Sequence, residues 1–140
     1  MKLICCYNTT KMSTYLLIDD DVILNILHQE VIRKVDPTGD IIVYNSSVRG
    51  LEYLNLKLDN NESLPKYIFL DIRMPEMNGF EVLDELMKHP LSQFENTRIF
   101  LLTSSLDDRD KSKAESYPII TGFRGKTVTT TMLREIIDAG

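Results

Sequence analysis

The chain has 140 residues, 43% of them hydrophobic, and its 21 acidic and 16 basic residues give a net charge of −5. This length fits one globular domain with a sizeable core and leaves no room for a second domain. The acidic balance, with both signs interspersed, argues against the broad basic face that nucleic-acid binding requires, so we expect no nucleic-acid partner.

Residues 1–12 come before the first clear structural pattern. Their apolar run is too short for a signal sequence or a membrane span, and the adjacent Cys5 and Cys6 suit neither a stabilising disulfide nor a metal site. We therefore expect a cytoplasmic protein that does not contact a membrane. Met12 opens the first strand-like stretch, so one hypothesis is that translation starts there and that the preceding residues are a disordered extension. On this interpretation residues 13–140 form the domain.

Short apolar runs alternate along the rest of the chain with segments of helical periodicity. The runs have strand length and are mostly rich in β-branched or aromatic residues; they span 14–18, 40–44, 67–71, 98–102 and 119–123. The segments between and after them predict helices over 22–35, 47–58, 79–88, 107–116 and 129–138. Strands that are apolar on both faces and alternate with helices indicate a parallel sheet covered by helices on each side.

The first of these helices has a clear N-terminus and an apolar stripe. Asp21 is placed to cap it, because a carboxylate there accepts a hydrogen bond from an early backbone N–H. Apolar residues recur at three-and-four spacing and are expected to face the core: Val22, Ile23, Ile26, Leu27, Val31 and Val35. His28 and His89 also lie on helical segments, and we expect both at the surface or half-buried, away from any site.

The helix over 107–116 is the weakest predicted element. Its apolar anchors are Leu106, Ala114 and Tyr117, so little burial offsets the entropy cost of ordering it. We expect this helix to be mobile and to shift by population change when the protein is activated.

Four strand ends carry polar side chains. Three acids, Asp19 to Asp21, directly follow the buried first strand, and such a cluster needs a cation or water to offset its repulsion. Asp71 ends the third strand, Thr103 follows the fourth, and Lys126 follows the fifth. In an open parallel sheet the carboxyl ends of the strands form the binding crevice. The sequence therefore predicts that carboxylates, a hydroxyl and an ammonium meet there.

This combination fits phosphoryl transfer to a carboxylate. Carboxylates, a backbone carbonyl and water form the oxygen shell that Mg²⁺ accepts, and the metal removes the repulsion within the acidic cluster. A phosphoryl group held there would also be neutralised by Lys126 and by the Thr103 hydroxyl. Asp71 is then the nucleophile.

Across about residues 13 to 138 the chain resembles the receiver domains of two-component response regulators, of the chemotaxis-regulator-like single-domain type. The stretch LDIRMPEMNGFEVL, 70–83, matches the family pattern of a phosphoacceptor Asp, two variable residues, Met-Pro, two more, Asp or Asn, then Gly. LLIDDD, LLTSS and GFRGK fall in the required order at suitable spacing. The resemblance implies a doubly wound α/β fold: a five-stranded parallel sheet of the flavodoxin-like type, with strand order 2-1-3-4-5 and helices on both faces.

The resemblance also implies a metal site. Asp71 would be the phosphorylated aspartate and one of the Mg²⁺ ligands. Asp20 would bind the ion directly, and Asp19 would bind it largely through water. The Arg73 backbone carbonyl would complete the protein's share of the metal shell, whereas Asp21 falls outside it.

A second group of implied roles concerns the phosphoryl group itself. Lys126 would pair with it, the Thr103 hydroxyl would close on it, and Phe123 would move together with Thr103. The family commonly has proline after the lysine, often with a cis bond before it, but Thr127 stands here. Since a cis bond to a non-proline residue costs about 2.5 to 4 kcal/mol, the sequence leaves the isomer open.

The loop after Asp71 contains turn-forming residues. Pro75 discourages helix at Met74, and Gly79 is expected to supply conformational freedom where the next helix begins. Asn78 suits a left-handed turn. An ordinary tight turn would use the same residues, so the loop indicates a functional site only because it follows Asp71.

Two classes of function follow. In the first, the protein is a signalling switch, to which a sensor histidine kinase or a histidine phosphotransfer protein donates a phosphoryl group. A downstream protein would bind the face formed by the helix over 107–116, the strand over 119–123 and the helix over 129–138. Such a protein catalyses only its own phosphorylation and dephosphorylation. With no output segment recognisable in the sequence, we expect it to act through protein contacts.

The rival class is an enzyme, a Mg²⁺-dependent phosphohydrolase that works through an aspartyl phosphate. Such enzymes usually need a second acid to protonate the leaving group and loops that enclose the substrate, and the sequence shows neither. A receiver that has lost phosphorylation is a third option. The complete set of key residues argues against it.

Overall fold

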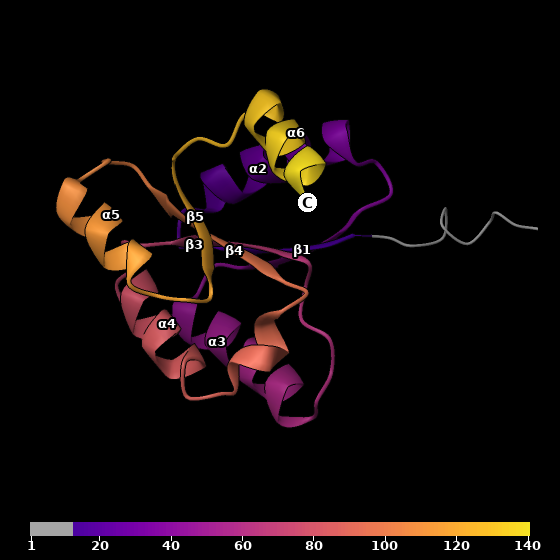
Figure 1. The fold of residues 1–140 in the computed structure, drawn as a ribbon. Coiled ribbons are helices and arrows are strands. Elements are labelled where there is room, and N and C mark those ends of the chain that lie inside the picture. Colours follow the sequence, from indigo (N-terminus) through magenta and orange to yellow (C-terminus); the bar gives the residue numbers. More distant parts are fainter. Residues whose placement is uncertain (1–12) are drawn as a thin grey trace, which may run out of the picture.

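Five parallel strands form one sheet in the computed structural model, which describes residues 13–140 (Figure 1). The strands are β1 (Thr14–Ile18), β2 (Asp40–Tyr44), β3 (Tyr67–Asp71), β4 (Arg98–Thr103) and β5 (Ile120–Gly125). Their order across the sheet is β2-β1-β3-β4-β5, so the chain winds first toward one edge and then toward the other. The predicted doubly wound, flavodoxin-like architecture is therefore confirmed. The hypotheses on residues 1–12 lie outside the described residues.

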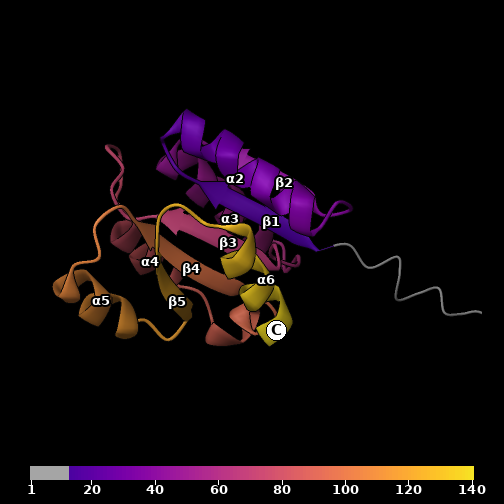
Figure 2. The same ribbon diagram turned by 90° about the horizontal axis from the view of Figure 1, so that it is seen from above.

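Helices cover both faces of this sheet, as Figures 1 and 2 show. On one face lie α2 (Val22–Val35) and α6 (Thr130–Ala139), and on the other lie α3 (Ser47–Asp59) and α4 (Gly79–Leu86). The remaining predicted helix, the one over 107–116, is α5 (Asp108–Glu115) and lies beside β5. A short 3₁₀ helix, Leu91–Phe94, was not expected from the sequence. Within the described residues, no helix is both long and apolar enough to span a membrane.

Each α-helix begins after a residue whose side chain accepts a hydrogen bond from a backbone N–H: Asp21, Ser46, Asn78, Asp107 and Thr129. These caps satisfy donors that the first turn of a helix leaves without a partner. At Asn78 the contact is reciprocal, because the Glu81 side chain also accepts the Asn78 N–H. The cap at Asp21 agrees with the sequence prediction.

The strands separate two hydrophobic cores. Because successive side chains of a strand point to opposite faces, Leu16 and Ile68 enter the core under α3 and α4, whereas Tyr15 and Phe69 enter the core under α2 and α6. The central strand β3 is buried along its whole length. The ends of the strands are therefore fixed by dense packing on both sides.

The buried face of α2 differs from the predicted stripe. Four residues expected in the core are exposed instead: Val22, Ile23, Ile26 and Leu27. The helix buries Asn25, His28 and Ile32. His28 is 3% exposed, so the expectation that it lies at the surface or half-buried is wrong. The cause is that the inner face of the first turns lies over loop backbone, whose polar groups need hydrogen-bond partners. Asn25 donates its side-chain amide to the Asp19 carbonyl, and His28 accepts the N–H of Val128.

The loop before α4 also differs from expectation. No glycine in the described part of the chain has a positive φ, so Gly79 is not there for a left-handed conformation. A Cβ at this position would lie 2.7 Å from the Asp71 carbonyl oxygen, which only a glycine avoids. Asn78 is extended, with φ −80°, and acts as the cap of α4 instead of forming a left-handed turn. The glycine therefore lets α4 start close against the backbone of Asp71.

The helix α5 has little apolar anchorage, as the sequence indicates. Ala114 is its one buried residue, and the expected anchor Leu106 is 69% exposed. Polar contacts hold the helix and its C-terminal loop to α4: the Lys113 ammonium lies over the Phe80 ring, and the Tyr117 hydroxyl donates to Asp84. Its expected mobility stays a prediction.

Candidate functional site

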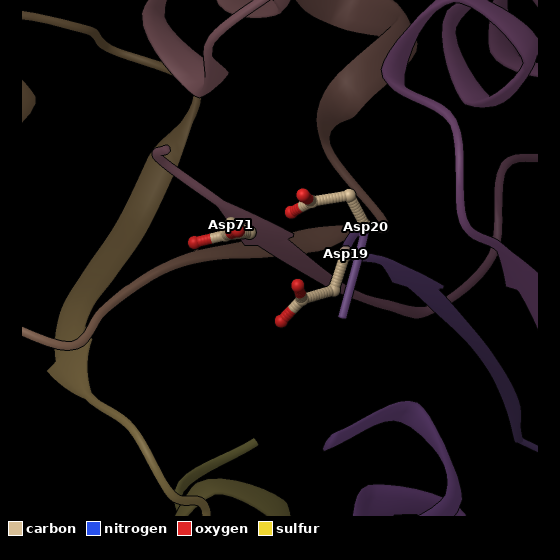
Figure 3. Close-up of side chains that lie close together, drawn as sticks. All are labelled: Asp19, Asp20 and Asp71. Carbon is tan, nitrogen blue, oxygen red and sulfur yellow. The ribbon is translucent and has the colours of Figure 1, made fainter. Parts of the chain in front are cut away.

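Three carboxylates meet at the carboxyl edge of the sheet. Asp19 and Asp20 directly follow β1, and Asp71 is the last residue of the neighbouring strand β3. Figure 3 shows the three side chains pointing toward a common space. One oxygen from each lies within 4.8 Å of the others. Acids that are about fifty residues apart in the sequence are thus brought close enough to share a cation.

Lys126 reaches the same space from the segment after β5. Its Nζ lies 2.9 Å from Asp19 Oδ2 and 3.0 Å from Asp71 Oδ1. Both contacts are short ion pairs. The three side chains are 3% to 11% exposed, so water screens these charges only weakly. The bond from Lys126 to Thr127, whose isomer the sequence leaves open, is cis.

The charges at this edge do not balance. One ammonium faces two buried carboxylates, and the exposed Asp20 adds a third acid. Burial, and after it the Asp19 carboxylate, raises the pKa of Asp71 from 3.8 to about 6, although Lys126 opposes the shift. For Lys126, burial lowers the pKa, but its contacts with Asp19 and Asp71 together outweigh burial and raise it. The site therefore keeps its lysine charged and carries surplus negative charge at neutral pH.

Because the site carries surplus negative charge, we expect the stability of the protein to depend on pH. A raised pKa means that the native state holds the Asp71 proton more tightly than the unfolded chain does. The stabilisation from Asp71 is therefore complete below the unfolded pKa, and it is lost as the pH rises through about 6. In metal-free protein, Asp71→Asn should leave the free energy of unfolding nearly unchanged in acid. Near pH 7.5 the same variant should raise it by about 2 to 3 kcal/mol.

Urea denaturation of both proteins in a chelating buffer between pH 3.5 and 8, a range that spans both the unfolded and the native pKa of Asp71, measures this difference. Asp59→Asn, which neutralises an exposed carboxylate at the end of α3, is the control and should show no such trend. A difference between Asp71→Asn and wild type that is constant with pH, or that grows toward acid, would contradict the assignment.

Backbone groups hold the two buried acids in place. Asp19 Oδ1 accepts the Asp21 N–H at 2.9 Å, and Asp71 Oδ1 accepts the Arg73 N–H at 3.3 Å. The Asp19 carbonyl also accepts the Asn25 side-chain amide at 2.8 Å. Asp21 itself caps α2 and does not join the cluster. The acids are therefore positioned before any ligand arrives.

Thr103 ends β4 at the same edge of the sheet, but its hydroxyl is engaged within its own loop. Oγ1 donates to the Ser105 carbonyl at 2.8 Å and accepts the Ser105 N–H at 3.1 Å. Among residues 13–140, it makes no hydrogen bond to Asp71. Phe123, on β5, is half-buried and packs against the core under α3 and α4. The structure thus does not join Thr103 or Phe123 to the acids.

Arg73 connects the acidic site with α5. Its backbone N–H binds Asp71, while its guanidinium Nη2 lies 2.5 Å from Asp110 Oδ2 on α5. The Arg73 side chain is 63% exposed and that of Asp110 is 14% exposed. This ion pair was not expected from the sequence, because nothing in the order of residues relates position 73 to position 110.

Sequence reasoning also missed two polar residues that support the site, Asn25 and His28. They lie three positions apart on one face of α2, in a segment that otherwise reads as apolar. Asn25 binds the Asp19 backbone, and His28 binds the backbone two residues after Lys126. Their spacing could have revealed them, since polar residues three positions apart on a helix lie on the same face.

The donor set fits a magnesium ion. Asp19, Asp20 and Asp71 offer only carboxylate oxygens, the ligand type that Mg²⁺ prefers in proteins. A divalent cation would also offset the negative charge that Lys126 leaves over. Asp20 is exposed, so an ion from solvent has access to one ligand without opening the core.

Comparison with known proteins gives a consistent family. The family model of the response regulator receiver domain matches residues 15–138. The crystal structure of a two-component response regulator from Cytophaga hutchinsonii is similar to this chain, with 32% sequence identity and a TM-score of 0.82. That match covers 92% of this chain and 96% of the other.

Two curated relatives are similar over part of their length. The probable methanogenesis regulatory protein FilR2 of Methanothrix harundinacea is 29% identical over 101 residues, which are 72% of this chain and 64% of that protein. The transcriptional regulatory protein CpxR homolog of Haemophilus influenzae is 32% identical over 100 residues, which are 71% of this chain and 38% of that protein. The chain thus spans less than two thirds of each.

Proposed function

Because the chain belongs to the response regulator receiver domain family, the switches of two-component signalling, we propose that it accepts a phosphoryl group on Asp71. Receiver domains interact with histidine kinases or phosphotransfer proteins, and the donor proposed here is a phosphohistidine of such a protein. The observation that carries the proposal is the ion pair of Lys126 with both Asp19 and Asp71. It puts a cation beside the carboxylate at which negative charge would arrive.

The proposed step is an exchange of one bond for another. A bond forms between an Asp71 carboxylate oxygen and phosphorus, the P–N bond of the donor breaks, and the donor imidazole takes up a proton. Lys126 Nζ and the Arg73 N–H both contact Oδ1, which favours Oδ2 as the attacking oxygen. With a pKa of about 6, Asp71 is mostly ionised at neutral pH, as a nucleophile must be. Lys126 then neutralises the arriving phosphoryl oxygens.

Mg²⁺ is the proposed cofactor, and receiver domains generally bind it. Asp19, Asp20 and Asp71 would hold the ion, with the Arg73 backbone carbonyl as a further proposed ligand. When bound, the ion neutralises the crowded acids and draws charge from the phosphoryl oxygens. Asp19 and Asp71 would need little rearrangement for this, because backbone N–H groups already orient both.

Thr103 and Phe123 are the proposed moving parts of the switch. The Thr103 hydroxyl is bound only two residues away, to Ser105, so it could exchange this local partner for a phosphoryl oxygen without disturbing β4. Phe123 lines a surface hollow between α5 and β5, together with Lys111 and Tyr117. We propose the face of α5, β5 and α6 as the binding surface of the downstream protein, because a partner seated there would detect the position of Phe123.

The exposed apolar residues of α2 support the proposed donor. Val22, Ile23, Ile26 and Leu27 lie on the first turns of the helix, directly after the acids at its N-terminus. Each is at least 47% exposed, and together they make an apolar patch at the rim of the site. A phosphohistidine must approach Asp71 closely, so a helical donor domain that packs on this patch would bring its histidine to the acids.

Incubation of the purified protein with Mg²⁺ and acetyl phosphate tests the proposed function. We expect one phosphoryl group per chain, sensitive to hydroxylamine as acyl phosphates are, and mapped to Asp71 by mass spectrometry. Chelation of the metal should prevent the labelling. A label on another residue would overturn the proposal, and repeated turnover of sugar or nucleotide phosphates would identify a phosphohydrolase instead.

A further inference from the structure

His28 is a buried histidine for which the phosphorylation chemistry has no direct use. It lies on the inner face of α2 and is 3% exposed. Its Nε2 accepts the backbone N–H of Val128 at 3.2 Å, a contact between residues one hundred positions apart. Val128 is itself 4% exposed, so this N–H depends on His28 for a partner among the described residues.

The contact lies next to the lysine of the site. Val128 is two residues after Lys126, whose Nζ joins Asp19 and Asp71. On the other side, the Lys126 backbone N–H donates to the Thr103 carbonyl at 2.8 Å. The segment Lys126–Val128 is therefore held at two points, by β4 before the cis bond and by α2 after it. A shift at either point moves the base of the lysine side chain.

The environment of His28 favours the neutral ring, in which Nε2 can accept a hydrogen bond. Burial lowers the pKa of His28, and the nearby Lys126 charge acts in the same direction, whereas Asp19 and Asp21 oppose it. The neutral ring has one donor and one acceptor nitrogen. Since Nε2 accepts, the hydrogen is on Nδ1.

We propose that His28 is a positioning residue for Lys126: by accepting the Val128 N–H it fixes the segment from which the lysine reaches Asp19 and Asp71. The inference rests on the proposed phosphorylation of Asp71 for its effect on rate. Its structural part, the placement of the Lys126 ammonium, stands independently. Asn25, one turn earlier on α2, holds the backbone of Asp19 in a comparable way.

Two substitutions separate the hydrogen bond from the volume of the ring. His28→Gln keeps an acceptor atom near the position of Nε2, whereas His28→Leu fills the space without one. We expect His28→Leu to slow phosphorylation by acetyl phosphate about tenfold, because a small misplacement of a catalytic group has a large effect on rate. His28→Gln should stay within about twofold of wild type. Equal slowing by both variants would overturn the proposal.

Combination with Lys126→Met tests whether His28 acts through the lysine. If it does, adding His28→Leu to Lys126→Met should slow the reaction no further. A further tenfold loss in the double variant would show general damage and contradict the proposal. His89→Leu is the matched control, since it removes another ring contact, to Asn55 at 2.9 Å, and should leave the rate unchanged.

Nitrogen NMR gives a result that needs no phosphorylation. In wild-type protein the His28 ring should show the Nδ1–H tautomer, and the Lys126 ammonium should give a protected signal that His28→Gln retains and His28→Leu loses. An Nε2–H tautomer would overturn the inference. If wild type takes up no phosphoryl group while these signals behave as expected, the proposed function fails and the positioning role stands.

Discussion

Asp71→Asn is expected to fold and to lose all uptake of a phosphoryl group from acetyl phosphate. Asparagine has almost the shape of aspartate but no nucleophilic carboxylate oxygen, so the acceptor is removed while the packing of the strand end is kept. The buried site favours a neutral group there, as the raised pKa of Asp71 indicates, so the fold should tolerate the change. Mass spectrometry of the intact protein after incubation with Mg²⁺ and acetyl phosphate measures the uptake.

Asp21→Asn is the control for this experiment. It also turns an acid of the same run into an amide, but Asp21 caps α2 and lies outside the cluster. Asparagine caps a helix as well as aspartate does, so stability and phosphorylation should both persist. Labelling of Asp71→Asn at the wild-type level, or its loss in Asp21→Asn, would show that another residue accepts the phosphoryl group.

Lys126→Met is expected to have the largest effect on stability. The substitution keeps the length of the side chain and removes the ammonium that two buried carboxylates share, at 2.9 and 3.0 Å. Removing one partner from a buried ion pair leaves an uncompensated charge, so we expect a loss of about 3 kcal/mol at neutral pH in metal-free protein. The loss should shrink below pH 6, where Asp71 takes up a proton. Phosphorylation should slow by about a hundredfold or more.

Denaturation curves at pH 7.5 and pH 5, with and without Mg²⁺, measure this loss. The ion should restore part of the stability, because it supplies positive charge to the same acids. Lys88→Met is the matched control: Lys88 makes an ion pair with Glu85 at 2.9 Å, but its side chain is 69% exposed. Exposed pairs contribute about 0 to 1 kcal/mol, so a loss from Lys88→Met as large as that from Lys126→Met would contradict the argument.

The fold could be predicted because its pattern is redundant. The strands have five or six residues and, except for β5, are mainly apolar, and each helix begins after a side chain suited to capping. Parallel strands also force their carboxyl ends to one edge, so the meeting of Asp19, Asp71 and Lys126 follows from the order of elements. Position along the chain was enough for this part of the site.

The other features of the site could not be predicted, because they depend on which polar groups lie close together, and need a hydrogen-bond partner or room, in the folded protein. The spacing of apolar residues on α2 gave no sign that loop backbone, and not core, lies under its first turns, so Asn25 and His28 were overlooked. Gly79 reads as a flexible position, yet its role is to leave room for the Asp71 carbonyl. The Thr103 hydroxyl faces its own loop, a side-chain orientation that no pattern of residues reveals.

Two sets of contacts connect Asp71, the proposed phosphoacceptor, with other parts of the protein, and they differ in their response to ionic strength. Lys126 meets its partners in a nearly dry interior, where dissolved ions have little access. The Arg73 side chain, which pairs with Asp110, is 63% exposed, so counterions compete for its guanidinium. Because Arg73 is bound to Asp71 through its backbone, it is the side-chain link between the acceptor loop and α5 that salt weakens. Concentrated electrolyte would therefore uncouple α5 from the acceptor loop long before it disturbed the acidic pocket itself.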